Sequence, residues 1–242
     1  MNDIWHYEGL ACWGPIGTEP LDAAVALLAL PQGGRVLDIG CGSGEVLARC
    51  ARRFGAGGVG VDKSEFAIAR SRERLESYAG FELLERDASE LSFDEGSFDA
   101  VIWLGGPYLG GDFETTLRTL KTWARPGGSV LVGHGFWIQP PPIPYLEATG
   151  LDPAEFGTHG DILTLATQLG FTTLFTRRST RDEWDTFEGR IHYNVERHAM
   201  SNPDNPDPQG RLEQRRQWFV AQQRWGRETM GFGLYLLANP PR

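Results

Sequence analysis

The stretch VLDIGCGSGE, residues 36–45, decides the fold class of this chain of 242 residues. A mainly apolar run leads into alternating glycines at Gly40, Gly42 and Gly44, and Glu45 then opens a helical pattern. Glycine lets the backbone turn sharply and lets a ligand approach the main chain closely. We therefore expect a buried strand, a ligand-binding turn and a helix, in that order.

Outward from this turn, apolar runs alternate with helical patterns through the first 137 residues. Such alternation is typical of right-handed βαβ units and of a parallel sheet covered by helices on both faces. We expect an α/β fold with a doubly wound, Rossmann-like sheet, mostly parallel, that closes with an antiparallel strand. The expected strands span residues 35–40, 57–62, 81–88, 98–104, 128–136, 171–179 and 231–240, and the expected helices span residues 21–30, 45–54, 64–79, 113–124 and 161–170.

The last third of the chain departs from this alternation. Residues 139–150, QPPPIPYLEATG, are rich in proline, which helix interiors and central strands exclude, so a rigid surface connection is expected. Two amphipathic helices are expected near residues 182–200 and 211–230, on either side of a turn at 202–210. Their place before the closing strand suggests a lid or a substrate wall.

Length and composition predict a single domain over residues 1–242. Within it we expect an N-terminal lid segment at 1–17, a cofactor-binding core at 18–137, and a substrate-side part at 138–242. The substrate-side part holds the connection, the helical insertion and the closing strand.

The composition also excludes several classes. Three cysteines without a CxxC pair predict neither a disulfide framework nor a zinc site, and no metal is expected. No apolar stretch approaches the roughly 20 residues that span a bilayer, and the N-terminus lacks a signal peptide, so a cytoplasmic protein without a membrane partner is expected. The net charge of −9 opposes encounter with nucleic acid.

Carboxylates follow the expected strands at the same edge of the sheet. Asp38 precedes the glycines, Asp62 ends the second strand, and Asp87 ends the third. Glu45 stands where the dinucleotide fingerprint needs its third glycine, and a carboxylate there repels a pyrophosphate. Acids without a basic group favour a cationic cofactor that lacks phosphates, and they disfavour a nicotinamide-dependent oxidoreductase.

In order along the chain, DIGCGSG, Asp62, Asp87-Ala88, FDAVIWL and RPGG-SVLV resemble class I S-adenosylmethionine-dependent methyltransferases over residues 18–137. LGGPYLGGDF, SVLVGHGFW and EWDTFEGRIHYNVERHAMSNPDNPD further resemble a group of bacterial methyltransferases of unassigned substrate. The resemblance implies S-adenosyl-L-methionine as the cofactor. By the same resemblance, His6, Tyr7 and Trp13 lie in a segment that folds over the cofactor, although ordinary burial would also explain them.

The resemblance also implies which residues bind the cofactor. The glycines line its methionine part, with Asp38 nearby, and Asp62 binds the ribose. Lys63 and the Asp87-Ala88 pair lie beside the adenine, and the end of the fourth strand faces the sulfonium. The full set is Asp38, Gly40, Cys41, Gly42, Gly44, Asp62, Lys63, Asp87, Ala88, Leu104 and Gly105.

Methyl transfer requires alignment of nucleophile, methyl group and sulfur, exclusion of water, and a group that accepts a proton where the nucleophile loses one. Candidate catalytic residues are His134 at the end of the fifth strand, and Glu188 and His192, spaced i, i+4. A structural histidine and a solvated polar pair are the alternatives. Tyr108, in the loop after the fourth strand, is a candidate wall or hydroxyl contact.

That loop, GGPYLGG, bears on the acceptor. Enzymes that methylate nucleobases grip the amine with an Asn or Asp before Pro-Pro-Tyr/Phe, but Gly105 and Gly106 offer no such side chain. The glycines leave room for a small-molecule acceptor with an O, N or C nucleophile. A nucleic-acid or protein methyltransferase of the same fold is the alternative, disfavoured because no basic stripe interleaved with aromatics occurs. A non-catalytic S-adenosylmethionine-binding module is a further alternative.

Overall fold

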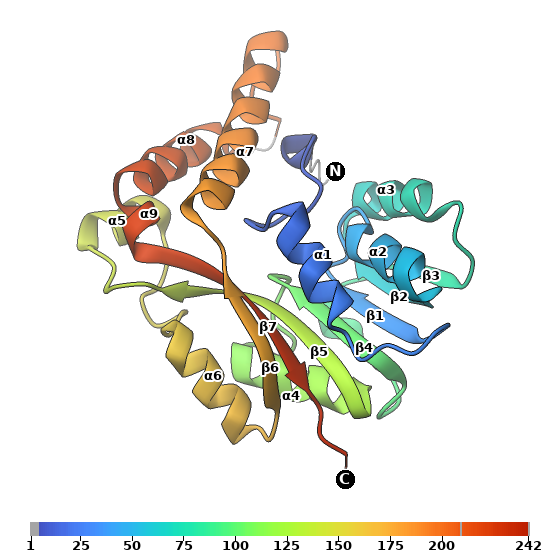
Figure 1. Ribbon diagram of the computed structural model, residues 1–242. Coiled ribbons are helices and arrows are strands. Elements are labelled where there is room, and N and C mark those ends of the chain that lie inside the picture. Colours follow the sequence, from blue (N-terminus) through green and yellow to red (C-terminus); the bar gives the residue numbers. More distant parts are fainter. Residues whose placement is uncertain (1–4, 209, 242) are drawn as a thin grey trace.

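The computed structural model describes residues 5–208 and 210–241, and a single sheet forms the centre of this part (Figure 1). Its seven strands lie in the order β3-β2-β1-β4-β5-β7-β6, and only β7 runs antiparallel to its neighbours. The doubly wound, mostly parallel sheet with an antiparallel closing strand is therefore confirmed. The strands are β1 (Arg35–Ile39), β2 (Gly57–Asp62), β3 (Phe81–Glu85), β4 (Phe98–Leu104), β5 (Ala124–Trp137), β6 (Thr172–Arg178) and β7 (Met230–Ala238).

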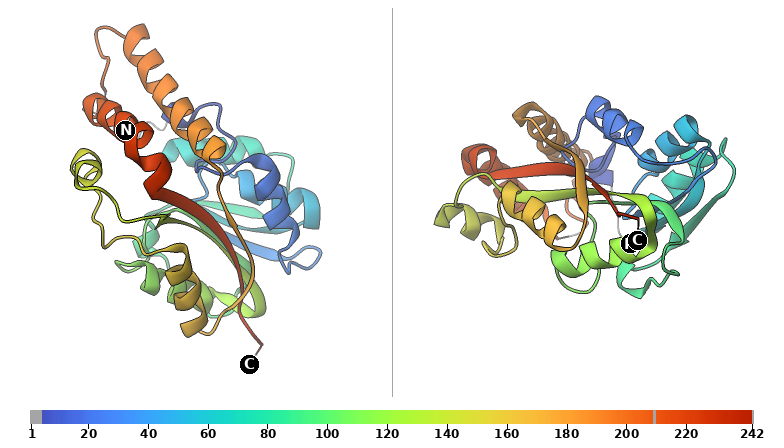
Figure 2. Two further views of the ribbon diagram at one scale, coloured as in Figure 1. Left: turned by 60° about the vertical axis from the view of Figure 1, so that its left-hand side comes forward. Right: turned by 60° about the horizontal axis from the view of Figure 1, so that its bottom comes forward.

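Helices cover both faces of the sheet, α1, α2 and α3 on one face and α4 and α6 on the other (Figures 1 and 2). Among the described residues, no helix combines the length and the hydropathy that a membrane crossing requires. The helices are α1 (Thr18–Ala26), α2 (Glu45–Phe54), α3 (Glu65–Leu75), α4 (Phe113–Trp123), α5 (Ile143–Thr149), α6 (His159–Gln168), α7 (Arg181–Ser201), α8 (Leu212–Ala221) and α9 (Arg227–Thr229), with short turns η1 (Trp5–Tyr7), η2 (Ala88–Glu90) and the π-helical η3 (Gln222–Gly226).

Side-chain alternation in the central strands matches these two layers. Val36 of β1 and Ile102 of β4 pack on the side of α1 and α2, whereas Leu37 and Trp103 pack on the side of α4. All four side chains are at most 1% exposed. A strand buried on both faces is apolar at nearly every position, which is why these segments read as continuous apolar runs.

The proline-rich segment at 139–150 is not only a connection, because residues Ile143–Thr149 form α5. Pro142 is its N-cap residue and Pro144 lies in the first turn, where the missing N–H would have no partner within the helix. Gly150 ends the helix with a φ of 72°. The expectation of a connection without a helix is therefore wrong, because proline disrupts the interior of a helix but is tolerated in its first turn.

The insertion between β6 and β7 places two helices near the turn η1. α7 and α8 pack against each other, and η1 lies along α7 (Figure 1). The loops that follow β1, β2 and β4 leave the sheet at the same edge, since these strands are parallel. The fold thus brings the glycine turn, the N-terminal segment and the insertion together.

Two glycine positions test the packing of the sheet and of α7. A Cβ on Gly58 would lie 1.8 Å from the carbonyl oxygen of Val36, so Gly58→Ala separates β1 from β2. We expect the free energy of unfolding to fall by about 3 kcal/mol or more. Gly189→Ala in α7 is the matched control, because its Cβ would meet open space, and we expect a gain of about 0.5–1 kcal/mol. Urea unfolding measures both, and an unchanged midpoint for Gly58→Ala would contradict this packing.

Candidate cofactor and active site

The glycine turn after β1 is attached to the end of β2. The N–H of Gly40 donates to the carbonyl of Val61 at 2.8 Å, and the N–H of Gly42 donates to the carboxylate of Asp62 at 3.0 Å. Gly40, Gly42 and Gly44 have φ of 70°, 54° and 73°, a region that residues with a Cβ rarely adopt. The turn therefore requires the glycines at which the sequence places them.

Asp38 lies beneath this turn as a buried carboxyl group. It is 2% exposed, and its Oδ2 atom has no hydrogen-bond partner. Burial, and then the neighbouring carboxylate of Asp62, raise the pKa of Asp38 to about 8. Burial also raises the pKa of Asp62, against the N–H groups of Ser64 and Gly42, which donate to it. Two acids on adjacent strands with one orphaned oxygen form a site that favours a cationic donor.

A small cavity of about 40 Å³ lies at this carboxyl group. It has room for a water molecule or two, but not for a larger ligand without movement of its walls. The walls come from β1, the glycine turn, the start of α2, the end of β4 and the N-terminal segment. They are Ala11, Cys12, Trp13, Asp38, Gly40, Cys41, Gly42, Ser43, Glu45, Val46 and Leu104.

Basic side chains also reach the glycine turn, contrary to the expectation of acids alone. Glu45 pairs with Arg49 at 2.8 Å and with Arg74 at 3.2 Å. Arg74 also donates to the carbonyl oxygen of Ser43 at 2.9 Å. The charge of Glu45 is therefore neutralised by partners, and the argument for a cationic ligand rests on Asp38 and Asp62. The sequence offered no signal for Arg74, because α3 carries several arginines.

The N-terminal segment covers the turn from above; we call residues 5–17 the strap. A Cβ on Gly42 would lie 2.7 Å from the indole of Trp13, so this ring sits directly on the glycine. Trp13 stacks on Tyr7, with ring centroids 5.1 Å apart, and Tyr7 stacks on Phe187 of α7 at 6.2 Å. An aromatic column therefore joins the glycine turn to the inserted helix.

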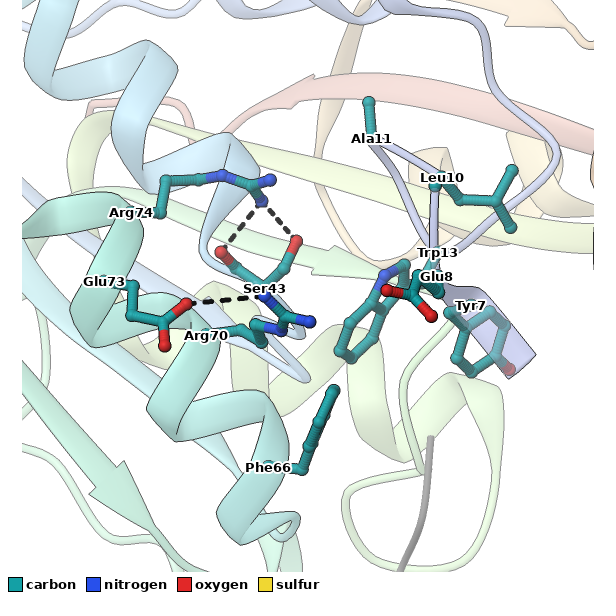
Figure 3. Close-up of a pocket in the computed structure, with 11 residues that line it drawn as sticks. Tyr7, Glu8, Leu10, Ala11, Trp13, Ser43, Phe66, Arg70, Glu73 and Arg74 are labelled. Atoms are coloured by element: carbon teal, nitrogen blue, oxygen red, sulfur yellow. Dashed lines mark hydrogen bonds and ion pairs between the residues drawn. The ribbon is translucent and has the colours of Figure 1, made fainter. Parts of the chain in front are cut away.

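A groove of about 740 Å³ separates the strap from α3 (Figure 3). Tyr7 and Trp13 line one side, Phe66 and Arg70 line the other, and Ser43 lies between them. This volume is in the range of small-molecule sites. Trp13, with Ala11 and Ser43, lines both the groove and the small cavity, so the two spaces are adjacent.

The remaining predicted cofactor residues also follow strand ends. Asp87 is exposed and caps η2, and the N–H and hydroxyl of Ser89 donate to it and hold its pKa below the usual range. Ala88 is buried behind it, and Lys63 is exposed after β2. Leu104 lines the small cavity. The structure thus places these residues around one edge, while their roles toward a ligand stay predictions.

The loop after β4 faces the glycine turn. A Cβ on Gly40 would lie 3.4 Å from the Cα of Gly106, so the two loops are in near contact. Gly105 has a φ of 75°, and a Cβ there would meet the ring of Phe232 at 3.4 Å. The glycines of this loop therefore allow close approach of two backbones.

His134 lies inside an aromatic cluster on β5. Its ring stacks on Phe113 at 3.9 Å and lies 5.4–5.9 Å from the rings of Trp103, Tyr108 and Phe156. Burial lowers the pKa of His134 to about 4 and raises the pKa of Tyr108 to about 12. At neutral pH the imidazole is an uncharged weak base and the phenol keeps its proton. The two side chains are therefore better suited to packing against a ligand than to proton transfer.

Glu188 and His192 both face α8 but do not bond to each other. Both carboxylate oxygens of Glu188 accept from the indole N–H of Trp218 at 3.2 Å, and His192 stacks on Phe219 at 3.8 Å. Glu188 is 6% exposed, and burial raises its pKa against Trp218 and Arg215. Within residues 5–208 and 210–241, His, Cys, Asp and Glu side chains form no group of three that suits a metal ion.

Comparison with known proteins agrees with this geometry. The family described as a methyltransferase domain matches residues 36–128. A solved S-adenosylmethionine-dependent methyltransferase of Geobacter sulfurreducens, in complex with S-adenosyl-L-homocysteine, superposes with a TM-score of 0.85 at 27% identity, covering 98% of this chain and 96% of that one. The fold, the carboxylates at the glycine turn and these likenesses define the chain as a class I S-adenosylmethionine-dependent methyltransferase.

Within this class, the chain is similar over most of its length to YjhP, an uncharacterized protein of Escherichia coli. The two are 27% identical over 219 residues, which are 87% of each chain. The demethylmenaquinone methyltransferase of Bacillus licheniformis is 31% identical over 112 residues, 46% of this chain and 48% of that protein. The resemblance to bacterial methyltransferases of unassigned substrate is therefore confirmed.

The orphaned carboxyl group gives stability a distinct pH dependence. Because the pKa of Asp38 is about 8 in the fold and about 4 when unfolded, the native state holds an extra proton between these values. The contribution of this proton to the free energy of unfolding is complete below about pH 4 and declines by about 1.4 kcal/mol per pH unit up to about pH 8. Asp38→Asn removes this decline, so the variant should match the wild type at pH 4 and exceed it at pH 8 in urea unfolding. Parallel pH profiles would contradict a buried, unpaired carboxyl group.

Proposed function

We propose that the protein transfers the methyl group of S-adenosyl-L-methionine to a small-molecule acceptor. The observation that carries the cofactor assignment is the orphaned, buried oxygen of Asp38 beside Asp62. An ammonium group of an amino-acid ligand suits this pair, because it supplies both positive charge and N–H donors. When bound, the sulfonium of the cofactor supplies an electrophilic methyl group.

The other predicted residues have the chemistry that the rest of the cofactor needs. Gly40, Cys41, Gly42 and Gly44 would contact the amino-acid part through their backbone. Asp62 would accept from the ribose hydroxyls, although it already accepts from two N–H groups. The adenine would lie beside Lys63, Asp87 and Ala88, and the sulfur beside Leu104 and Gly105.

Three observations support a small acceptor. The strap covers the glycine turn, which leaves a groove of limited volume. Gly105 and Gly106 supply no side chain to grip an exocyclic amine. The net charge of −9 disfavours a polyanionic substrate. This proposal divides the domain as expected, into a lid at 1–17, a cofactor core at 18–137 and a substrate side at 138–242.

Among the four candidate catalytic residues, Glu188 suits proton acceptance best. Its buried carboxylate shares one indole N–H between two oxygens, so it keeps capacity to accept a further hydrogen bond. Burial, and then the charges of Glu188 and Asp62, raise the pKa of Tyr7 against the charge of Arg215. His134 and Tyr108 would instead form an apolar wall, and His192 would hold α8.

Cofactor binding is tested by thermal unfolding with S-adenosyl-L-homocysteine. We expect a saturating concentration of about 100 times Kd to stabilise the protein by about 2.7 kcal/mol, and NAD to have no effect. Asp62→Ala should abolish the shift, and Asp62→Asn should weaken it, since the ribose loses a charged acceptor. Asp204→Ala, in the exposed turn after α7, is the control that keeps the full shift. Stabilisation by NAD alone would refute the methyltransferase proposal.

The size of the acceptor is tested by following the label of methyl-tritiated S-adenosyl-L-methionine in a bacterial extract. We expect the protein to place the label in the fraction that passes a filter of about 1 kDa cutoff. Asp38→Asn and Asp62→Ala should reduce this transfer strongly, because both acids hold the cofactor. Label retained with RNA, DNA or protein would overturn the small-molecule proposal while leaving cofactor binding intact.

A further inference from the structure

One face of α7 carries a stripe of polar and aromatic residues. Glu183, Phe187, Arg190, Asn194 and His198 follow at steps of four, three, four and four residues. At 3.6 residues per turn these steps keep all five side chains on one side of the helix. The stripe spans most of the motif EWDTFEGRIHYNVERHAM, and its five residues are distinct from the candidate base Glu188 and from His192, which lie on the same helix.

The stripe meets the strap, which runs antiparallel to α7. At one end, Glu183 accepts from the N–H of Gly17 at 2.8 Å. At the other end, the amide of Asn194 donates to the carbonyl oxygens of His6 at 2.9 Å and Glu8 at 2.8 Å. Two polar clamps, eleven residues apart on the helix, therefore hold the backbone of the strap near both of its ends.

Ring contacts lie between and beyond the clamps. Phe187 stacks on Tyr7, and His198 stacks on Trp5 with centroids 4.4 Å apart. The guanidinium of Arg190 lies within about 4 Å of a Cβ built on Gly9. Each member of the stripe thus contacts the strap.

The other faces of α7 have other neighbours. Ile191 and Val195 are buried with the interior, and Glu188 and His192 contact α8. These contacts anchor the insertion apart from the strap, and of the stripe residues Glu183 adds to them by capping α7 at Thr180 and pairing with Arg177 of β6. An amide that gives both hydrogens to main-chain carbonyls specifies where the strap backbone lies, which apolar packing alone would not do.

The strap connects α7 to the glycine turn. Tyr7 lies between Phe187 and Trp13 in the aromatic column, and Trp13 rests on Gly42. A displacement of the strap from α7 therefore displaces the side chain that covers the turn and lines both the small cavity and the groove.

We propose that Glu183, Phe187 and Asn194 are positioning residues for the cofactor: they hold the strap so that Tyr7 and Trp13 close over the ligand at the glycine turn. This rests on the proposed function, since it requires a cofactor at that turn. It gives α7 a role in cofactor affinity although none of the three residues belongs to the nucleotide-binding core.

The test is the affinity of the full-length protein for S-adenosyl-L-homocysteine, measured by isothermal titration calorimetry. Asn194→Asp keeps the shape of the side chain but replaces two donors with a carboxylate that faces two carbonyl oxygens. We expect Kd to rise about ten-fold, which corresponds to about 1.4 kcal/mol. Asn202→Asp is the matched control, because the amide of Asn202, the C-cap residue of α7, contacts the carbonyl and the ring Nδ1 of His198 on its own helix, and Kd should not change.

Hydrogen exchange supplies a readout that a loss of general stability would not move. In the wild type, the ligand should slow amide exchange in residues 5–17 and in the glycine turn, 40–44. In Asn194→Asp at saturating ligand, protection of the turn should persist and protection of the strap should be lost. Equal affinity, or equal strap protection, in the two proteins overturns the proposal. Failure of the wild type to bind the ligand would instead refute the proposed function.

Discussion

The arrangement of the whole site depends on the attachment of the glycine turn to the end of β2. The N–H groups of Gly40 and Cys41 share the carbonyl of Val61 at 2.8 and 2.9 Å, and the hydroxyl of Ser71 donates to the carbonyl of Gly42 at 2.8 Å. These bonds hold the turn to β2 and α3, and the ring of Trp13 packs on the turn at Gly42. A few hydrogen bonds to main-chain groups therefore hold β2, the turn and α3 together, and the strap joins them through the ring of Trp13.

Burial, more than composition, decides what each acid does at this edge. Glu45 lies at the outside of the turn, where two arginines neutralise it, whereas Asp38 lies beneath the turn without a partner for one oxygen. Asp87 is exposed and serves as a helix cap. Three carboxylates that look equivalent in the sequence thus have a paired, an orphaned and a capping role, and only the orphaned one favours a cationic ligand.

The sheet and the cofactor edge could be predicted because their signals are local. The apolar runs, the glycines and the acids at strand ends each occupy a few consecutive residues, and the order of the elements then restricts the topology. The contact of Glu188 with Trp218 joins residues 30 positions apart, and that of Asn194 with His6 joins residues 188 positions apart. No local sequence pattern predicts either of these two contacts. The helix α5 was missed for a different reason, because the tolerance of proline depends on its position in the helix.

The antiparallel pairing of the strap with α7 has a consequence for the order in which the molecule is made. All the motifs of the nucleotide-binding core are complete by residue 137, yet the strap obtains its clamps only when Asn194 has been synthesised. On the ribosome, the sheet edge and the glycine turn can begin to fold before the strap, residues 5–17, has its partner helix. The docking of the strap is therefore a late event in biogenesis, because it joins residues 6–8 to a helix that is synthesised nearly 190 residues later.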